Sequence, residues 1–183
     1  LFMKLTFCGG AEVVTGANYL LESGGTKILI DCGLEQGGSF VEGKNFEPFS
    51  YNPAEIEAVF LTHAHVDHTG LLPKLYKDGF RGKVFSTDPT REFAELLLLD
   101  SEHILNGEAE RRGRTPIYET EHIEGIMKLW EGVHYHKPFS IGPFSVEFFD
   151  AGHILGSAFI RIQAEGKKIV FSGDLGNYPA PII

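Results

Sequence analysis

Four side chains of the kinds that bind metal ions lie within six residues of one another: His63, His65, Asp67 and His68. They follow the apolar residues 58–61, which are typical of a buried strand. The alternation of His63 and His65 suits two imidazoles approaching one ion, while Asp67 and His68 offer ligands to a second ion close by. Neutral imidazole and carboxylate suit zinc and related divalent metals. A chance cluster is the alternative, but unpaired polar groups at the end of a buried strand are costly. The pattern therefore predicts a metal site.

Three further segments place polar side chains directly after a predicted strand. Asp31, His153 and Asp174 are the potential ligands that they contain. Loops at strand ends commonly carry the chemistry of a mixed α/β fold, so we expect these loops to supply the rest of the site. The three segments are residues 29–33, 150–158 and 171–177.

Short apolar or β-branched runs separated by glycine turns predict the strands that position these loops. Strands lie towards both ends of the chain and helices in the middle, which predicts a mixed α/β layered fold. The predicted strands cover residues 4–8, 18–22, 26–31, 58–61, 83–86, 146–149, 158–163 and 168–171.

Three helices are expected between these strands. A short one covers residues 71–77, and a longer one begins at Asp88-Pro89, with the aspartate as N-cap, and continues to about residue 105. The polar residues 107–114 are expected to form a loop. The third helix covers residues 121–130, where apolar side chains recur at helical spacing. We interpret that stripe as a packing face: Ile123, Ile126, Met127 and Trp130.

Length and composition favour one globular domain over residues 1–183, with 43% hydrophobic and 22% charged residues. The formal net charge of −9 argues against a surface that coats nucleic acid. Two bound divalent ions would add four positive charges at one point, so a local phosphate-binding site stays open.

The two cysteines, Cys8 and Cys32, are expected to be buried thiols in a reducing compartment. The first residues lack the pattern of a signal peptide. The longest apolar run, residues 96–99, is far too short to span a bilayer. We therefore expect a cytoplasmic protein with no membrane contact.

The ordered set of Asp31, the 63–68 cluster, His153 and Asp174 resembles the metallo-β-lactamase superfamily, over nearly the whole chain. Within that superfamily the sequence looks most like the β-CASP branch of RNA-processing nucleases. That branch contains the endonuclease subunit of the pre-mRNA 3′-end cleavage machinery and its bacterial and archaeal relatives. A glyoxalase II is instead expected to carry threonine and proline around its third histidine. The segments that resemble the β-CASP branch are residues 10–20, 70–73, 152–158 and 172–176.

The resemblance implies the N-terminal portion of a metallo-β-lactamase-type αββα sandwich, with a mixed sheet and helices on its outer face. It also implies two zinc ions, one on His63, His65 and His153 and the other on Asp67 and His68, bridged by Asp174. A metal-bound hydroxide, oriented by Asp67, would attack the phosphodiester. Asp31 is expected to fix the ligand loop through hydrogen bonds. The alternative for Asp31 is an ordinary residue of a strand-end turn.

The other histidines and one serine leave alternatives open. His122 is expected to be a solvent-exposed helix residue, while His134 and His136 either face the cleft or lie on the surface. His103 either helps to hold a helical lid or lies on a helix surface. Ser157 either reaches the substrate phosphate or caps a turn.

The predicted function is that of a zinc-dependent ribonuclease with RNA as its partner. A hydrolase of a small ester or thioester is the first alternative, and a non-catalytic scaffold subunit of an RNA-processing complex is the second. The resemblance also implies that the inserted β-CASP domain, the last metal-ligating histidine and the general acid lie beyond residue 183. An isolated half-sandwich would expose apolar and unpaired edges, which predicts self-association, for instance as a homodimer, or marginal stability.

Overall fold

Alternating side chains in the central strands define the layers of the structure. Ile28, Ile30 and Phe60 point to one side, where they pack against the second sheet. Leu29 and Val59 point to the other side, where they pack against the helices. Because both faces of these strands are buried, their sequences are continuously apolar, as in other sheets that are covered on both sides.

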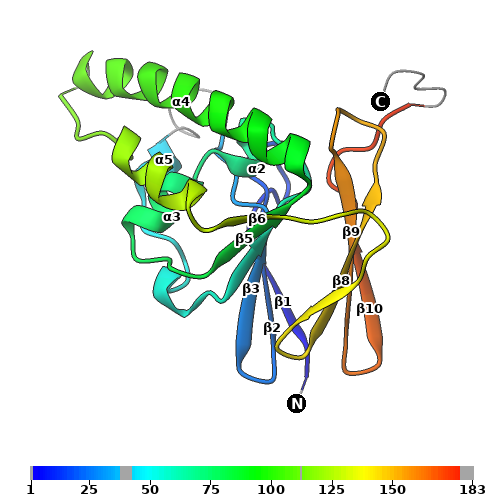
Figure 1. Ribbon diagram of the computed structural model, residues 1–183. Helices are drawn as coiled ribbons and strands as arrows, with labels where there is room; N and C mark the ends of the chain where they lie inside the picture. Colours follow the sequence, from blue (N-terminus) through cyan, green and yellow to red (C-terminus); the bar gives the residue numbers. More distant parts are fainter. Residues whose placement is uncertain (1, 38–42, 112, 178–183) are drawn as a thin grey trace.

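The computed structural model describes residues 2–37, 43–111 and 113–177. It shows two sheets whose inner faces pack against each other (Figure 1). The larger sheet has six strands in chain order, antiparallel through its first three strands and parallel from the third to the sixth. It is therefore a mixed sheet, as the sequence predicts. Its strands are β1 (Lys4–Gly9), β2 (Asn18–Ser23), β3 (Thr26–Ile30), β4 (Ala58–Phe60), β5 (Lys83–Ser86) and β6 (Trp130–Gly132).

The second sheet is antiparallel, with its four strands in the order β10-β9-β8-β7. Its inner face supplies Phe144, Val146, Phe148, Ile160 and Ile162 to the core between the sheets. Its strands are β7 (Phe139–Ile141), β8 (Phe144–Asp150), β9 (Ala158–Ala164) and β10 (Lys167–Phe171).

The helices cover the outer face of the larger sheet (Figure 1). The longest, α4 (Asp88–Arg111), crosses the end of that sheet, with its first turn beside the second sheet's loops. Within the described ranges, no helix is long and apolar enough to cross a membrane. The remaining helical elements are η1 (Lys44–Phe46), η2 (Pro53–Glu55), α2 (Val66–Thr69), α3 (Leu72–Lys77) and α5 (Thr120–Met127).

Helix ends account for most differences from the sequence-based prediction. Helix α4 continues to Arg111, so residues 107–111 are helical rather than loop; one glycine inside a helix is tolerated when its neighbours favour helix. Thr87, rather than Asp88, caps the helix, because its Oγ1 accepts from Thr90 N at 3.4 Å.

The C-terminal end of α5 also differs from the sequence-based prediction. The helix ends at Met127, three residues earlier than predicted, and Trp130 starts β6. Its indole N–H donates to Ser86 Oγ at 2.8 Å, which ties the residue to β5. All four residues of the predicted stripe are nevertheless buried, so their interpretation as a packing face is confirmed.

Two further predictions concern the cysteines and the segments beyond the described residues. Cys32 is buried as predicted, whereas Cys8 is only half-buried, and both thiols are free. The structure describes nothing after residue 177, so the segments that the resemblance places beyond residue 183 stay a prediction.

Candidate metal centre

The loop that follows β4, residues 62–70, is here called the histidine loop, and it is anchored from both sides by backbone hydrogen bonds. Asp67 O accepts from Ala17 N at 2.9 Å, and His68 O accepts from Cys32 N at 2.8 Å. Helix α2 forms the second half of this loop, and the amides of His68 and Thr69 there donate to His65 O. These bonds hold four potential ligands in one rigid segment of the core.

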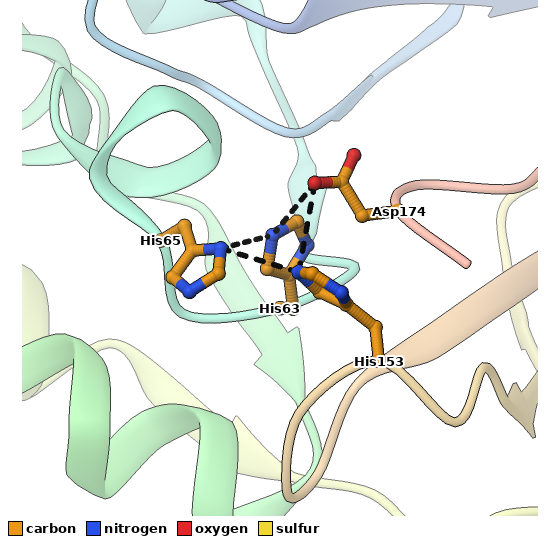
Figure 2. A group of neighbouring side chains, drawn as sticks. All are labelled: His63, His65, His153 and Asp174. Carbon is orange, nitrogen blue, oxygen red and sulfur yellow. Dashed lines mark hydrogen bonds and ion pairs between the residues drawn. The ribbon is translucent and has the colours of Figure 1, made fainter. Parts of the chain in front are cut away.

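Three imidazoles and one carboxylate converge at the end of this loop (Figure 2). His65 Nδ1 lies 3.1 Å from His63 Nε2 and 3.3 Å from His153 Nε2. Asp174 Oδ2 lies 3.8 Å from His63 Nε2 and 3.6 Å from His153 Nε2. Ligands arranged tetrahedrally around zinc at its usual bond lengths are roughly 3.3 Å apart. The four atoms, here called the first ligand set, therefore fit a zinc-sized ion.

A second group of donor atoms lies beside the first. His68 Nε2 is 3.6 Å from Asp174 Oδ1 and 3.9 Å from Asp67 Oδ2. Asp174 thus directs one carboxylate oxygen at the first ligand set and the other at His68. We call His68, Asp67 and the Asp174 Oδ1 atom the second ligand set.

Asp31 lies behind the second ligand set and is almost completely buried. Its Oδ2 accepts from His68 Nδ1 at 2.7 Å and from Thr62 Oγ1 at 2.8 Å, and its Oδ1 accepts from Thr62 N at 2.8 Å. Its backbone has a φ of 57°, in the left-handed region that aspartate occupies only occasionally. Three hydrogen bonds to one side chain stabilise this conformation and fix the ring of His68.

Close packing of glycines brings the second sheet's loops to the site. A Cβ on Gly173, whose φ is +52°, would lie 2.6 Å from Thr62 Cβ, and one on Gly176 would lie 1.5 Å from Gly152 O. The first contact lays the Asp174 loop on the histidine loop, and the second lays it on the loop that carries His153. Side chains larger than hydrogen at these positions would separate the ligands.

Ser157 shapes the loop that carries His153. Its Oγ accepts from His153 N at 3.1 Å and from Ile154 N at 3.2 Å. Ser157 is completely buried, so of the two sequence-based alternatives the structure favours the turn cap.

Burial and charge act differently on the histidines. Burial, together with the neighbouring His68, His65 and His153, lowers the pKa of His63 to about 2. Burial and His153 also lower the pKa of His65. Burial alone would lower the pKa of His68, but the hydrogen bond to Asp31 and the nearby carboxylates outweigh it and raise that pKa. His63 and His65 are therefore held as neutral imidazoles, the form that binds metals.

The other histidines lie away from these two sets. His134 and His136 are exposed, and the ring of His136 packs against Phe149. His103 is exposed on α4. His122 is partly buried rather than exposed, because its Nδ1 accepts from Glu119 N at 3.1 Å and caps α5.

Sequence reasoning assigned no role to two residues near the ligands. Thr62 joins Asp31 to the histidine rings, and its position directly before His63 was the available signal. Tyr19 lines a cavity of about 300 Å³ that also reaches Asp31, His68 and Asp174. Burial, Asp31 and Asp174 raise the pKa of Tyr19, so its hydroxyl is a hydrogen-bond donor at neutral pH.

The layered mixed sheet, with histidine and aspartate side chains converging on the loops at its strand ends, defines a metallo-β-lactamase fold. The family model of the Metallo-beta-lactamase superfamily matches residues 12–182, so the chain belongs to that superfamily. The metallo-beta-lactamase fold protein YhfI from Bacillus subtilis superposes with a TM-score of 0.60 at 20% identity, covering 97% of this chain and 64% of that one.

Within the superfamily, the chain matches β-CASP RNA nucleases, which confirms the resemblance predicted from sequence. It is 39% identical to Ribonuclease TTHA0252 of Thermus thermophilus over 96% of this chain and 38% of that protein. It is 35% identical to Transcription termination factor FttA of Methanosarcina mazei over 94% of this chain and 27% of that protein. The chain therefore spans between about a quarter and two fifths of the length of these relatives.

Proposed function

We propose that this chain carries the catalytic centre of a zinc-dependent phosphodiesterase that hydrolyses RNA. One observation carries the proposal: the two carboxylate oxygens of Asp174 face two adjacent ligand sets, at 3.6–3.8 Å from their nearest imidazole nitrogens. A single carboxylate in this position is suited to bridging two ions, as two-metal hydrolases require.

The proposed ligands divide between the two sets. His63, His65 and His153 would hold one zinc, Asp67 and His68 the other, and Asp174 both. When bound, the ions would supply a Lewis acid for a phosphate oxygen and lower the pKa of a water molecule. Their positive charge would also offset the formal net charge of −9 at the point where an RNA phosphate must approach.

The carboxylates have different roles in this proposal. Asp67 is partly exposed beside His68, so its carboxylate can accept a hydrogen bond from an attacking water molecule and orient it. Asp31 is too deeply buried to touch a substrate, and it acts by holding His68 and Thr62. The name of the Thermus thermophilus relative, a ribonuclease, supports RNA over a small ester as the substrate. The convergence of the ligands argues against a non-catalytic scaffold.

Metal removal tests the proposal. End-labelled single-stranded RNA is incubated with the protein extended by the segments that the resemblance places beyond residue 183, as purified, after chelation and dialysis, and after zinc is restored. Cleavage is expected to be lost on chelation and to return with zinc. Conversion of a small-ester substrate with no cleavage of RNA would favour the alternative hydrolase, and RNA cleavage that survives full chelation would contradict the proposed centre.

A further inference from the structure

A buried hydroxyl lies between the two ligand sets and belongs to neither. Thr62 is 1% exposed. Its Oγ1 lies 2.8 Å from Asp31 Oδ2, 3.1 Å from His63 Nδ1 and 3.3 Å from His68 Nδ1. One oxygen atom therefore contacts a histidine of each set as well as the carboxylate that supports the second.

Proton counting fixes the direction of these hydrogen bonds. A threonine hydroxyl donates one proton and accepts through its lone pairs, whereas an ionised carboxylate only accepts. Asp31 therefore receives protons from Thr62 Oγ1 and from His68 Nδ1. With its own proton committed to Asp31, Thr62 Oγ1 is left to accept the proton of His63 Nδ1.

This arrangement determines the tautomers of both histidines. In its neutral form each carries its proton on Nδ1, so each Nε2 keeps a free lone pair. The Nε2 atom of His63 faces the first ligand set, and that of His68 faces Asp67 and Asp174. If the Thr62 hydroxyl turned to donate to His63, the proton of His63 would move to Nε2 and block the first set.

Thr62 also links the histidine loop to the second sheet. Its carbonyl oxygen accepts from Ala158 N, the first residue of β9, at 2.7 Å. Gly173, next to Asp174, packs on its Cβ. The backbone of Thr62 therefore holds the second sheet in place, while its side chain reaches the ligands of the first.

We propose that Thr62 is a positioning residue that fixes the Nδ1–H tautomers of His63 and, through Asp31, of His68, and so couples the two ion sites. The inference rests on the proposed two-zinc centre but not on RNA as the substrate. Partners that orient metal-ligating histidines typically contribute about 10- to 100-fold to metal affinity. In Thr62→Val, His63 Nδ1–H is left without an acceptor in a fully buried position and Asp31 loses one of its donors.

The test compares three variants of the full chain without RNA. Thr62→Val removes the hydroxyl, Thr62→Ser keeps it, and Thr69→Val removes another buried hydroxyl of the histidine loop. Thr69 Oγ1 donates to the carbonyl oxygens of Ala64 and His65, at 3.1 and 3.0 Å, so it is a matched control for general loss of a hydrogen bond. Zinc affinity is measured by competition with a chromophoric chelator, and the tautomers of His63 and His68 by long-range ¹H–¹⁵N NMR.

For Thr62→Val we expect both zinc affinities to fall by about tenfold or more, with Thr62→Ser and Thr69→Val retaining affinities close to wild type. We also expect Nδ1–H tautomers in the wild-type protein, a result that stands even if Thr62→Val does not fold. A protonated His63 Nε2 in wild type would overturn the inference. So would unchanged affinities in Thr62→Val, loss at one site alone, or an equal loss in Thr69→Val. A wild-type chain that binds no zinc would instead refute the proposed metal centre itself.

Discussion

The two sheets contribute to the candidate metal centre in different ways. The larger sheet supplies His63, His65, Asp67 and His68 from one continuous loop. The backbone of this loop is bonded to the segments that flank β2 and β3, and to Ala158 of the second sheet. The second sheet supplies a single residue from each of two loops. The side chain of His63 is 1% exposed, whereas that of His153 is 25% exposed and that of Asp174 is 48% exposed.

This difference in burial separates the ligands that are part of the core from those that loops of the second sheet bring to the site. Leu61, Ala64 and Leu71 lie in the hydrophobic core, so the ligands of the histidine loop are held by the packing of the larger sheet on its helices. His153 and Asp174 reach the centre through the packing of the second sheet's loops against the first sheet. Changes in the histidine loop are therefore expected to affect stability and chemistry together, and changes in the second sheet's loops to affect mainly metal binding.

The largest effect is expected from removing a ligand of the histidine loop. His65→Ala or Asp67→Ala should reduce RNA cleavage by more than about 100-fold. Each side chain would hold a metal ion that stabilises the charge developing at the reacting phosphate. RNA binding should be largely retained, since it is spread over many contacts. Single-turnover cleavage and filter binding measure the two quantities, with the exposed His134→Ala as a matched control. Near-normal cleavage by Asp67→Ala would rule out its role in orienting water.

Substitutions of two glycines test directly how the histidine loop and the second sheet's loops differ. Gly33→Ala would place a Cβ 1.6 Å from Asp67 O, and Gly176→Ala would place one 1.5 Å from Gly152 O. The clashes are similar, but the first lies in the core and the second between exposed loops. We expect Gly33→Ala to cost about 3 kcal/mol of unfolding free energy and Gly176→Ala about 1 kcal/mol.

Urea unfolding followed by circular dichroism measures both values, and zinc content is determined on the same samples. Gly176→Ala should lose zinc while remaining folded. Equal destabilisation by the two substitutions would show that the second sheet's loops are as integral to the fold as the histidine loop.

Asp174→Asn separates the two ligand sets. The side chain is half exposed, so the unfolding free energy should change by less than about 0.5 kcal/mol. The second ligand set would lose its charged bridge, while three histidines would still hold the first ion. Zinc content should fall from two ions to one, as measured by elemental analysis after gel filtration. Retention of two tightly bound ions would contradict the bridging role.

Ser157→Ala should have the smallest effect. Removing the turn cap leaves the amides of His153 and Ile154 without their acceptor, which costs about 1 kcal/mol. Zinc affinity at the first ligand set should weaken by less than tenfold, because His153 is displaced rather than lost. Isothermal titration with zinc gives the affinity. A loss as large as that of His153→Ala would mean that Ser157 does more than cap the turn.

The sequence predicted the features that depend on local pattern. The apolar strands follow from hydrophobic periodicity and the histidine loop from ligand spacing, whereas the mixed sheet was implied by the resemblance to a known superfamily. Strand β6 was missed because Trp130 continues the helical spacing of the apolar residues before it, and β7 because three alternating residues are too few to establish a period. The extension of α4 through Gly107 was missed because a glycine in a polar segment usually ends a helix.

The relation between distant residues could not be predicted from spacing alone. The packing of Gly173 on Thr62 joins residues more than 100 positions apart, and the three hydrogen bonds of Asp31 join residues 31 or 37 positions apart. The capping role of Ser157 was left open, because the sequence does not show whether its hydroxyl points into the turn or outwards. The resemblance to a known superfamily, rather than composition, indicated which distant ligands belong together.

The most direct test of the two-ion centre is a zinc-soaked crystal measured at the zinc absorption edge. The account predicts two anomalous peaks about 3.5–4 Å apart. One should lie within about 2.2 Å of His63 Nε2, His65 Nδ1 and His153 Nε2, and the other beside His68 Nε2, with Asp174 between them. A single peak, or peaks away from these side chains, would contradict the claim that loops from both sheets together form a two-metal site.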